Sequence, residues 1–486
     1  MTDQRAKATM LIDGEAVAAA TGDWIEVDNP ANGAVISQVP KGSAADAEAA
    51  LEAASRAFKT WAVTPAAERA RLLMKAGAIV QERRDHLATL LTTEQGKPLP
   101  DARKEIDGAA ETLRFYAEEA KRIGGDIAPP NAPNARSLVI RQPLGVVVAI
   151  VPWNYPVSLL AWKIAPALAA GCTVVAKPPS ETPLAVLGFV EAIIDAGLPR
   201  GSLNAVTGTS DEVGRALVRS PMAQMVAFTG STESGIDIYR EAAPTLKKLN
   251  LELGGQTALV VFADSDLGRA VADGVKRSFR NAGQICNGVN RILVQNAVAD
   301  AFTDRFVQAT RALRVGGGFD DPAPDLGPML NDAGLQRVQR HVDDAVTRGA
   351  NLAHGGERLT DGLLAAGRFY PPTVLTGATG EMLVMREETF GPVVGISTFA
   401  EVDEAIAAAN ATPYGLVTYV YTNDLNTMFR AAEGIESGTV SVNNVAPDSF
   451  FAPYGGWKQS GLGVELSARG MEEFQRLKHI RIELNA

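Results

Sequence analysis

Cys286 is the residue best suited to nucleophilic chemistry in this sequence. It lies in the stretch NAGQICNG, residues 281–288, and is one of only two cysteines in 486 residues. Glycines and side-chain amides surround it, so we expect an accessible sulfur close to backbone donors, a setting that lowers the pKa of a thiol. No histidine is near in sequence, so a Cys–His pair could form only in space. The other cysteine, Cys172 in AAGCTVVA, is interpreted as a small core residue.

Two further side chains could support such a nucleophile. Glu252 stands alone in the apolar segment LELGG, residues 251–255. Burial raises the pKa of a carboxyl group into the range that suits a general base, while a salt bridge to a distant arginine or lysine is the alternative. Asn154 lies in VPWNYP, residues 151–156. Its amide could donate a hydrogen bond to a developing oxyanion, or it could bond its own backbone in a turn.

Two strand-to-helix loops could hold an anionic ligand. In FTGSTESG, residues 228–235, the glycines let the backbone approach a ligand, and Ser231 could cap the helix or bind phosphate. The standard G-x-G-x-x-G fingerprint is absent. In AKPPSETP, residues 176–183, Lys177 and Ser180 could hold a ribose or a phosphate. The alternatives are an ordinary capped turn for the first loop and a solvated surface lysine for the second.

The composition is that of an ordinary globular enzyme. Hydrophobic residues make up 46% and charged residues 21% of the chain, and the net charge is −10. This balance, without a dense run of Lys and Arg, argues against a nucleic-acid partner. The N-terminus lacks a signal-peptide core and the longest apolar runs are strand-sized, so we expect a cytoplasmic protein without a membrane segment. Two cysteines and four scattered histidines predict neither a disulfide framework nor a metal site.

The elements that must position these residues follow from the hydrophobic periodicity. Helical patterns cover 44–62, 65–96 and 99–124, and 137–143 alternates like an exposed strand. Continuous apolar runs then alternate with helical stretches, which indicates a parallel sheet covered on both faces, with ligands bound at the carboxyl ends of its strands. The predicted strands are 146–151, 173–176, 202–206, 225–228, 249–253 and 258–262, and the predicted helices are 159–171, 183–197, 211–220 and 232–248.

A second alternating series begins near Gly255, and a length of 486 residues also favours two or three domains. Its predicted strands are 291–295, 369–374, 391–399, 416–421 and 438–443, and its predicted helices are 297–313, 331–349, 402–410 and 425–434. The tail HIRIEL, residues 479–484, alternates as a strand. An isolated terminal strand needs a sheet edge, which we expect on another subunit.

Taken together and in order, these segments resemble the aldehyde dehydrogenase superfamily from about residue 10 to the C-terminus. The resemblance is carried by VPWNYP, GCTVVAKPPSETP, FTGSTESG, LELGG, FRNAGQIC, EETFGPV, TPYGL and PYGGWKQSGLG. It implies an α/β fold with two doubly wound domains and a β-strand oligomerisation arm. A dinucleotide-binding domain would span 1–254, with 137–145 contributing to the arm. The catalytic domain would span 255–446, and 447–486 would return to the cofactor domain and end in the C-terminal strand of the arm.

The resemblance also implies a role for each candidate residue. Cys286 would attack the aldehyde carbon, giving a thiohemiacetal and then a thioester. Asn154 and the backbone N–H of Cys286 would stabilise the oxyanion, and Glu252 would activate water to release the acid. NAD or NADP would be the oxidant. Cofactor contacts are implied at Val151, Pro152, Trp153, Lys177, Ser180, Glu181, Gly208, Gly230, Ser231, Leu253, Glu388 and Phe390.

Three residues bear on the choice of cofactor and of reaction class. Members of the family that prefer NAD often have a glutamate three residues after the lysine, whereas here Ser180 occupies that position and Glu181 follows, so NADP is compatible with the sequence. Members that transfer the acyl group to coenzyme A tend to lack the glutamate matched by Glu252, which favours a free acid product. A catalytically silent structural protein on this fold is the alternative from another class.

The general pattern is most similar to the succinate-semialdehyde dehydrogenases, and an aldehyde is the expected partner. Arg280 and Ser449 match positions around the substrate carboxylate, and Tyr155 is a further pocket residue. Trp162 stands where that group usually has an arginine, and Gly288 replaces a second cysteine. Because an indole cannot clamp a carboxylate as a guanidinium does, a small aliphatic or aromatic aldehyde is the alternative to a semialdehyde such as succinate semialdehyde. We expect a homodimer or homotetramer.

Overall fold

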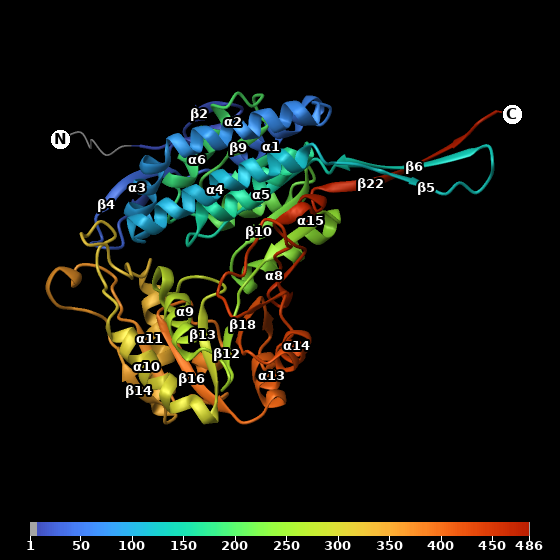
Figure 1. The fold of residues 1–486 in the computed structure, drawn as a ribbon. Helices are drawn as coiled ribbons and strands as arrows, with labels where there is room; N and C mark the ends of the chain where they lie inside the picture. The colour runs from blue at the N-terminus through green and yellow to red at the C-terminus, as the bar shows by residue number, and fades with distance from the viewer. Residues whose placement is uncertain (1–6, 486) are drawn as a thin grey trace, which may run out of the picture.

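Two large sheets of different strand order form the body of the molecule, and a narrow three-stranded sheet projects from it (Figure 1). The computed structural model describes residues 7–485. The first sheet has the order β2-β1-β9-β8-β7-β10-β11-β21, in which β9, β8, β7, β10 and β11 are parallel and the outer strands are antiparallel. Its strands are β1 Met10–Ile12, β2 Glu15–Val17, β7 Val146–Ile150, β8 Thr173–Lys177, β9 Leu203–Ala205, β10 Ala223–Thr229, β11 Lys248–Glu252 and β21 Gly461–Leu462.

The second sheet has the order β14-β15-β16-β13-β12-β18-β19, with one antiparallel edge strand, β14. Its strands are β12 Thr257–Val261, β13 Val289–Gln295, β14 Asn351–His354, β15 Thr373–Thr376, β16 Val393–Phe399, β18 Val417–Tyr421 and β19 Thr439–Val442. The remaining strands are β3 Trp24–Asp28, β4 Val35–Pro40, β5 Asp126–Ala128, β6 Ala135–Pro143, β17 Tyr414–Gly415, β20 Trp457–Lys458 and β22 Gln475–Glu483.

The helices cover both faces of these sheets. They are α1 Ala44–Trp61, α2 Ala66–Glu82, α3 Arg84–Gln95, α4 Leu99–Ala120, α5 Pro156–Ala170, α6 Leu184–Ile194, α7 Arg215–Arg219, α8 Thr232–Ala242, α9 Leu267–Phe279, α10 Ala299–Arg311, α11 Asp332–Thr347, α12 Leu383–Arg386, α13 Val402–Asn410, α14 Leu425–Gly434 and α15 Ser467–Glu472. Alternate residues of β7 enter two different cores. Val147 packs with α2 to α6, whereas Val146 packs with α1 and α7. This two-sided burial explains why the strand is apolar throughout.

Several predicted boundaries are wrong for local reasons. The predicted helix 65–96 is broken at Arg83, where α2 ends and α3 begins. The predicted helix 232–248 ends at Ala242, because a short 3₁₀ turn containing Pro244 follows it. The predicted strand 369–374 begins only at Thr373, since two prolines precede it and cannot donate to a sheet ladder. Helix α9 and the N-terminal strands lie in segments where the sequence analysis proposed no element.

The C-terminal strand pairs within its own chain. Nine residues of β22 run antiparallel to β6, from Gln475 opposite Pro143 to Glu483 opposite Ala135, and β5 extends the same sheet. The expectation that this strand needs the sheet edge of another subunit is therefore wrong: it pairs with the segment 137–143, which was also expected to lie in the arm. The three strands extend away from both large sheets (Figure 1).

Candidate active site

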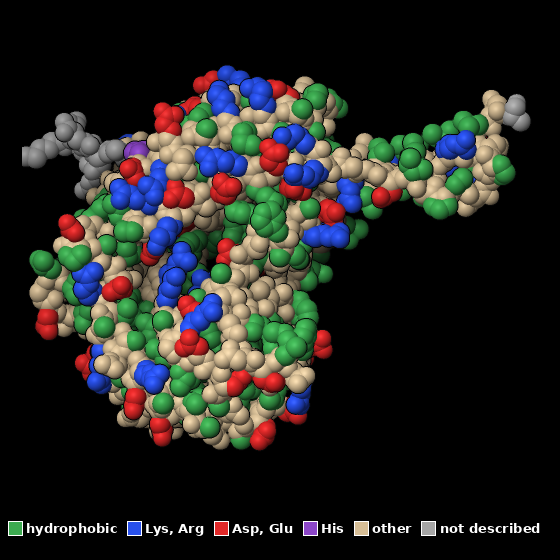
Figure 2. Space-filling view, viewed as in Figure 1, with side chains coloured by type: hydrophobic (Ala, Val, Ile, Leu, Met, Phe, Trp, Pro, Cys, Tyr) green, Lys and Arg blue, Asp and Glu red, His purple; other side chains and the backbone are tan. Residues whose placement is uncertain are grey.

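A pocket of about 250 Å³ lies where α4, α5 and the loop that contains Cys286 meet the ends of two strands of the first sheet. Thr229 ends β10 and Glu252 ends β11, so the pocket is at the carboxyl edge of the parallel strands, where ligands bind in folds of this kind. The space-filling view shows a hollow between the two halves of the molecule (Figure 2). The pocket brings together the three predicted catalytic residues and the four predicted substrate residues: Asn154, Tyr155, Trp162, Glu252, Arg280, Cys286 and Ser449.

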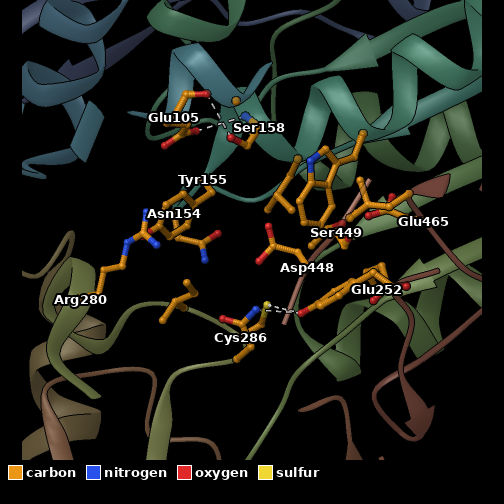
Figure 3. A pocket seen from close by; sticks show the side chains of 18 of the residues that line it. Glu105, Asn154, Tyr155, Ser158, Glu252, Arg280, Cys286, Asp448, Ser449 and Glu465 are labelled. Carbon is orange, nitrogen blue, oxygen red and sulfur yellow. Dashed lines mark hydrogen bonds between the residues drawn. The ribbon is translucent and has the colours of Figure 1, made fainter. Parts of the chain in front are cut away.

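Cys286 follows a tight turn that ends α9. Asn281 and Ala282 in this turn have φ values of 53° and 55°, in the left-handed region that non-glycine residues seldom adopt. The turn carries Cys286 back into the pocket (Figure 3). Its Sγ lies 4.0 Å from the hydroxyl of Tyr454. Burial, with the carboxylates of Glu388 and Glu252, raises the pKa of Cys286 to about 12. The prediction of a lowered thiol pKa is therefore wrong, because sequence neighbours do not show this burial.

Asn154 is 3% exposed and contacts the loop of Cys286 directly. Its Nδ2 donates to the carbonyl of Gln284 at 3.1 Å, and its buried Oδ1 has no hydrogen-bond partner among the described residues. Its own carbonyl accepts hydrogen bonds from Lys97 at 2.7 Å and from Asn281 at 3.4 Å. The Asn154 side chain therefore does not bond its own backbone in a turn, which was the alternative interpretation. A free amide hydrogen remains near the sulfur for a further acceptor.

Glu252 is 4% exposed, and within residues 7–485 neither of its carboxylate oxygens has a hydrogen-bond partner. Burial, reinforced by the negative charge of Glu465, raises the pKa of Glu252 well above its ordinary value. The salt bridge considered as an alternative does not form: Lys163 pairs instead with Glu465 at 2.6 Å and donates to Thr229 at 2.6 Å. A carboxyl group that lines a pocket, has no hydrogen-bond partner and has a raised pKa is suited to general-base chemistry.

The four predicted substrate residues line different parts of the pocket. Figure 3 shows Arg280 beside Asn154 and Tyr155, with Ser449 and Glu252 on the other side of the pocket. The guanidinium of Arg280 lies 5.7 Å from the centre of the Tyr155 ring. The indole of Trp162 packs edge-on against Tyr454 at 5.6 Å. The sequence analysis missed several lining residues, because a single side chain on a helix or in a loop gives no signal that it faces a pocket: Lys104 and Glu105 of α4, Ser158 of α5, and Ile285, Asp448 and Phe450 of loops.

A second cavity of about 270 Å³ lies at the carboxyl ends of β7, β8 and β10. Lys177 lines it and is 3% exposed, so the alternative of a solvated surface lysine is wrong. Among the described residues, its Nζ donates only to the carbonyl of Pro178, at 3.3 Å, and burial lowers the pKa of Lys177 to about 8. Arg215, which sequence reasoning missed, lines the same cavity.

The other predicted cofactor residues lie around these two cavities rather than in the lining of the second. The Ser180 hydroxyl donates to the carbonyl of Gly208 at 3.1 Å. Ser231 caps α8 by accepting a hydrogen bond from Ser234 N–H at 3.2 Å, as the capped-turn alternative describes. Gly230 N–H donates to the carbonyl of Glu252 at 3.0 Å. The remaining members of the set do not line the second cavity, and Leu253 lines the first: Val151, Pro152, Trp153, Glu181, Leu253, Glu388 and Phe390.

Glu388 and Phe390 lie on one loop held by α11. Oε1 of Glu388 accepts a hydrogen bond from Gly255 N–H at 3.0 Å, and burial raises the pKa of Glu388 to about 7. The ring of Phe390 packs edge-on against Trp153 at 5.5 Å. Between them, Thr389 is held from α11 by Arg337 and His341. Neither of these two residues was singled out from the sequence, because their partners lie about 50 residues away along the chain.

Comparisons with known proteins agree with this architecture. Residues 17–480 match the model of the aldehyde dehydrogenase family. The chain is 42% identical to an NADP-dependent succinate-semialdehyde dehydrogenase of Escherichia coli, over 98% of this chain and 97% of that protein. It is also 42% identical to a glutarate-semialdehyde dehydrogenase of Pseudomonas putida, over 97% of each. A betaine aldehyde dehydrogenase of Staphylococcus aureus in complex with NAD⁺ has a TM-score of 0.96 and 36% identity, over 98% of this chain and 95% of that one.

The chain belongs to the aldehyde dehydrogenase family. It is an enzyme of the aldehyde dehydrogenase class on the predicted α/β fold, so the family, fold class and enzyme class expected from the sequence are confirmed. In the part of the chain that the structure describes, no helix is both long and apolar enough to cross a membrane. Across residues 7–485, no three His, Cys, Asp or Glu residues are grouped so that they could hold a metal ion.

Proposed function

We propose that this chain oxidises a carboxylate-bearing aldehyde, a semialdehyde, to the dicarboxylic acid with NAD or NADP. The observation that carries the proposal is the guanidinium of Arg280 in the wall of the pocket. Across the described residues, no carboxylate or carbonyl of the protein pairs with Arg280, and its contact is the Tyr155 ring. The other cations of the pocket are engaged, Arg277 with Tyr419 at 2.8 Å and Lys104 with Asp101 at 3.2 Å. Arg280 is therefore available for the carboxylate of a substrate.

The two named relatives that act on semialdehydes support the same choice. One is named for succinate semialdehyde and the other for glutarate semialdehyde, and both are 42% identical to this chain. Both compounds carry a carboxylate a few bonds from the reacting aldehyde carbon. A guanidinium near the sulfur fits that arrangement better than it fits a neutral aldehyde.

The second cavity suits a nicotinamide dinucleotide. Its buried lysine, which makes no salt bridge within the described residues, and its position at strand ends favour a ribose or a phosphate. Lys177 would contact the adenosine ribose, Ser231 would lie at the pyrophosphate, and Glu388 with Phe390 would hold the nicotinamide end. The eight-stranded unit would then be the dinucleotide-binding domain and the seven-stranded unit the catalytic domain. A bound NAD⁺ or NADP⁺ would supply the oxidising power of the reaction as a hydride acceptor.

The protein's own residues carry out the remaining steps. Cys286 releases its proton to solvent and its sulfur bonds to the aldehyde carbon, while the π electrons of the carbonyl move to its oxygen, which becomes an oxyanion. Asn154 Nδ2 and the backbone N–H of Cys286 donate hydrogen bonds to that oxyanion. After oxidation to the thioester, Glu252 takes a proton from a water molecule whose oxygen attacks the acyl carbon. The carbon–sulfur bond then breaks, which releases the acid and regenerates the free cysteine.

Arg280→Gln is expected to raise KM for succinate semialdehyde by about 10- to 100-fold, because the loss of a charged hydrogen bond costs about 1.5–3 kcal/mol. The effect on a neutral aldehyde such as propanal should be small. Steady-state oxidation of both aldehydes, followed by reduced-cofactor absorbance, measures this difference. Arg430→Gln is the matched control, since Arg430 is exposed on α14 and pairs with Asp403.

Equal losses for both aldehydes in Arg280→Gln would contradict the assignment of a semialdehyde. They would favour the second candidate, a small aliphatic or aromatic aldehyde, which the apolar side chains of Trp162, Ile285 and Phe450 in the pocket support. Trp162→Arg separates the two candidates further. If the substrate carboxylate and the Trp162 indole lie in the same pocket, this variant should lower KM for the semialdehyde. It should also slow the oxidation of an aromatic aldehyde.

Ser180→Glu is expected to weaken NADP binding by about tenfold more than NAD binding, which corresponds to about 1.4 kcal/mol. The added carboxylate would lie next to Gly208, close to the loop of Lys177, and would repel a 2′-phosphate. Fluorescence titration with each oxidised cofactor measures the two dissociation constants. Ser180→Ala is the control, because it removes the same hydroxyl without adding charge; equal weakening of both cofactors by glutamate would contradict a 2′-phosphate near Ser180.

The projecting sheet of β5, β6 and β22 supports a homo-oligomer. It carries exposed apolar side chains at Ile127, Leu477 and Leu484, which a single chain leaves in water. A homodimer or homotetramer would cover them.

The two cysteines are not joined to each other, which fits a reducing compartment such as the cytoplasm.

A further inference from the structure

A buried ion pair lies directly behind Asn154. Lys97 and Glu105 are 1% and 4% exposed, and Nζ of the lysine is 2.5 Å from the carboxylate of the glutamate. The desolvation of two buried charges is costly unless hydrogen bonds satisfy both groups. Both side chains are satisfied by groups that flank the candidate active site, so the pair lies at a place where it can control the position of Asn154.

The glutamate of the pair caps the helix that begins just after Asn154. Oε1 of Glu105 accepts a hydrogen bond from the N–H group of Val157 at 3.0 Å. It accepts a second one from the N–H group of Ser158 at 3.2 Å (Figure 3). The N-cap residue of α5, Tyr155, makes no side-chain capping bond. A helix N-terminus leaves four N–H groups without partners in the helix. Glu105, from the neighbouring helix α4, therefore fixes the start of α5.

The lysine of the pair holds the backbone of Asn154 itself. Nζ of Lys97 donates to the carbonyl of Asn154 at 2.7 Å and lies 3.8 Å from the centre of the Tyr155 ring. By contrast, the side chain of Asn154 is held by one hydrogen bond, from Nδ2 to the carbonyl of Gln284, and its Oδ1 has no partner in the described part of the chain. The backbone position therefore decides where the amide donor lies relative to Cys286.

We infer that Lys97 and Glu105 form a buried clamp that positions Asn154 as the oxyanion donor for Cys286. Neither side chain touches the reacting atoms in this arrangement, so both are positioning residues. The inference rests on the proposed roles of Asn154 and Cys286. Removing the lysine would leave the carbonyl of Asn154 with the longer hydrogen bond from Asn281, at 3.4 Å, and let the loop between β7 and α5 shift.

Two reactions of the Cys286 sulfur distinguish positioning from general loosening, and neither needs an aldehyde or a cofactor. Acylation by p-nitrophenyl acetate passes through a tetrahedral oxyanion, whereas alkylation by iodoacetamide is a displacement that forms none. We expect Lys97→Met to slow acylation by about 100-fold, the effect of a misplacement of about 1 Å, and to leave alkylation unchanged. Asn154→Ala, the reference variant, should slow acylation by about 10²–10³-fold.

A variant without either charge guards against misfolding. Lys97→Met combined with Glu105→Gln leaves no unpaired buried charge and keeps an oxygen to cap α5, so it should fold, as circular dichroism and thermal unfolding would show. Its acylation should remain slow, because the hydrogen bond from the Lys97 ammonium to the carbonyl of Asn154 is still missing. Lys121→Met is the matched control: Lys121 follows α4, is exposed, and pairs with Glu118 at 3.0 Å. Both of its rates should equal those of the original protein.

A double-mutant cycle completes the test. If Lys97 acts through Asn154, Lys97→Met should add little to the loss of acylation in the Asn154→Ala background. Slow acylation in Asn154→Ala with an unchanged rate in the charge-free double variant would overturn the inference alone. An unchanged rate in Asn154→Ala would overturn the proposed role of Asn154 and the inference with it. Slowed alkylation in the folded Lys97 variants would show that the pair only maintains structure around the cysteine.

Discussion

Cys286→Ala is expected to abolish aldehyde oxidation, lowering kcat by roughly 10⁴-fold or more, as removal of a nucleophile does in enzymes with covalent intermediates. The side chain that carries the reaction is absent in this variant, and in the described part of the chain the other cysteine, Cys172, is buried with its thiol donating to the carbonyl of Phe474 at 3.2 Å. Steady-state oxidation with each cofactor measures the loss.

Cys172→Ala is the matched control for this variant, because it removes the other thiol of the chain. It should keep wild-type kcat, since Cys172 is buried in the core of the first sheet and is not among the residues that line the pocket. Full activity in Cys286→Ala, or loss of activity only in Cys172→Ala, would overturn the assignment of the nucleophile. Mass spectrometry of the iodoacetamide-treated protein should place the modification on Cys286.

Glu252→Gln is expected to stop turnover after one cycle. Glutamine keeps the shape of the side chain but cannot take a proton from water, so the thioester on Cys286 should accumulate. It also cannot raise the pKa of Cys286 by negative charge, as the Glu252 carboxylate does, so the acylation steps should not be slowed. Rapid mixing should show a burst of about one reduced cofactor per active site, followed by a steady rate lowered by roughly 10²–10⁴-fold, the usual contribution of a general base.

The pH dependence of deacylation provides a second test of the role of Glu252. A base acts in its deprotonated form, and burial raises the pKa of Glu252 well above its ordinary value, so deacylation in the original protein should rise as pH increases through that pKa. Deacylation in Glu252→Gln should lose this rise. Glu111→Gln, an exposed change on α4, is the control. A glutamine variant with normal turnover and no burst would show that another group activates the water.

Much of the fold could be predicted because the strands that build it are apolar on both faces. The run 146–151 becomes β7, whose successive residues enter two different cores, and such burial leaves a continuous pattern in one segment. Boundaries failed where a local break decided them, as at Arg83 between α2 and α3. The edge strands β1 and β2 were not predicted, because three-residue strands are too short to show a period.

The residues of the candidate site were predicted more completely than its electrostatics. Three residues lie in recognisable sequence segments: Cys286, Glu252 and Asn154. The structure brings all three to one pocket. The surroundings of Cys286 in sequence are small and polar, yet burial and two distant glutamates raise its pKa. The Lys97–Glu105 pair gave no signal either, because its partners Asn154 and Val157 lie more than 50 residues further along the chain.

The sequence by itself determined the family, the α/β class and the residue types able to carry out thioester chemistry, because motifs and hydrophobic periods are local properties of the chain. Only the tertiary structure decided that the Glu252 carboxylate has no hydrogen-bond partner among the described residues, that Lys177 is buried, and that β22 pairs with β6 of its own chain. It also placed the buried clamp behind Asn154. These properties depend on which distant segments pack together, since burial, charge pairing and pKa are set by neighbours in space.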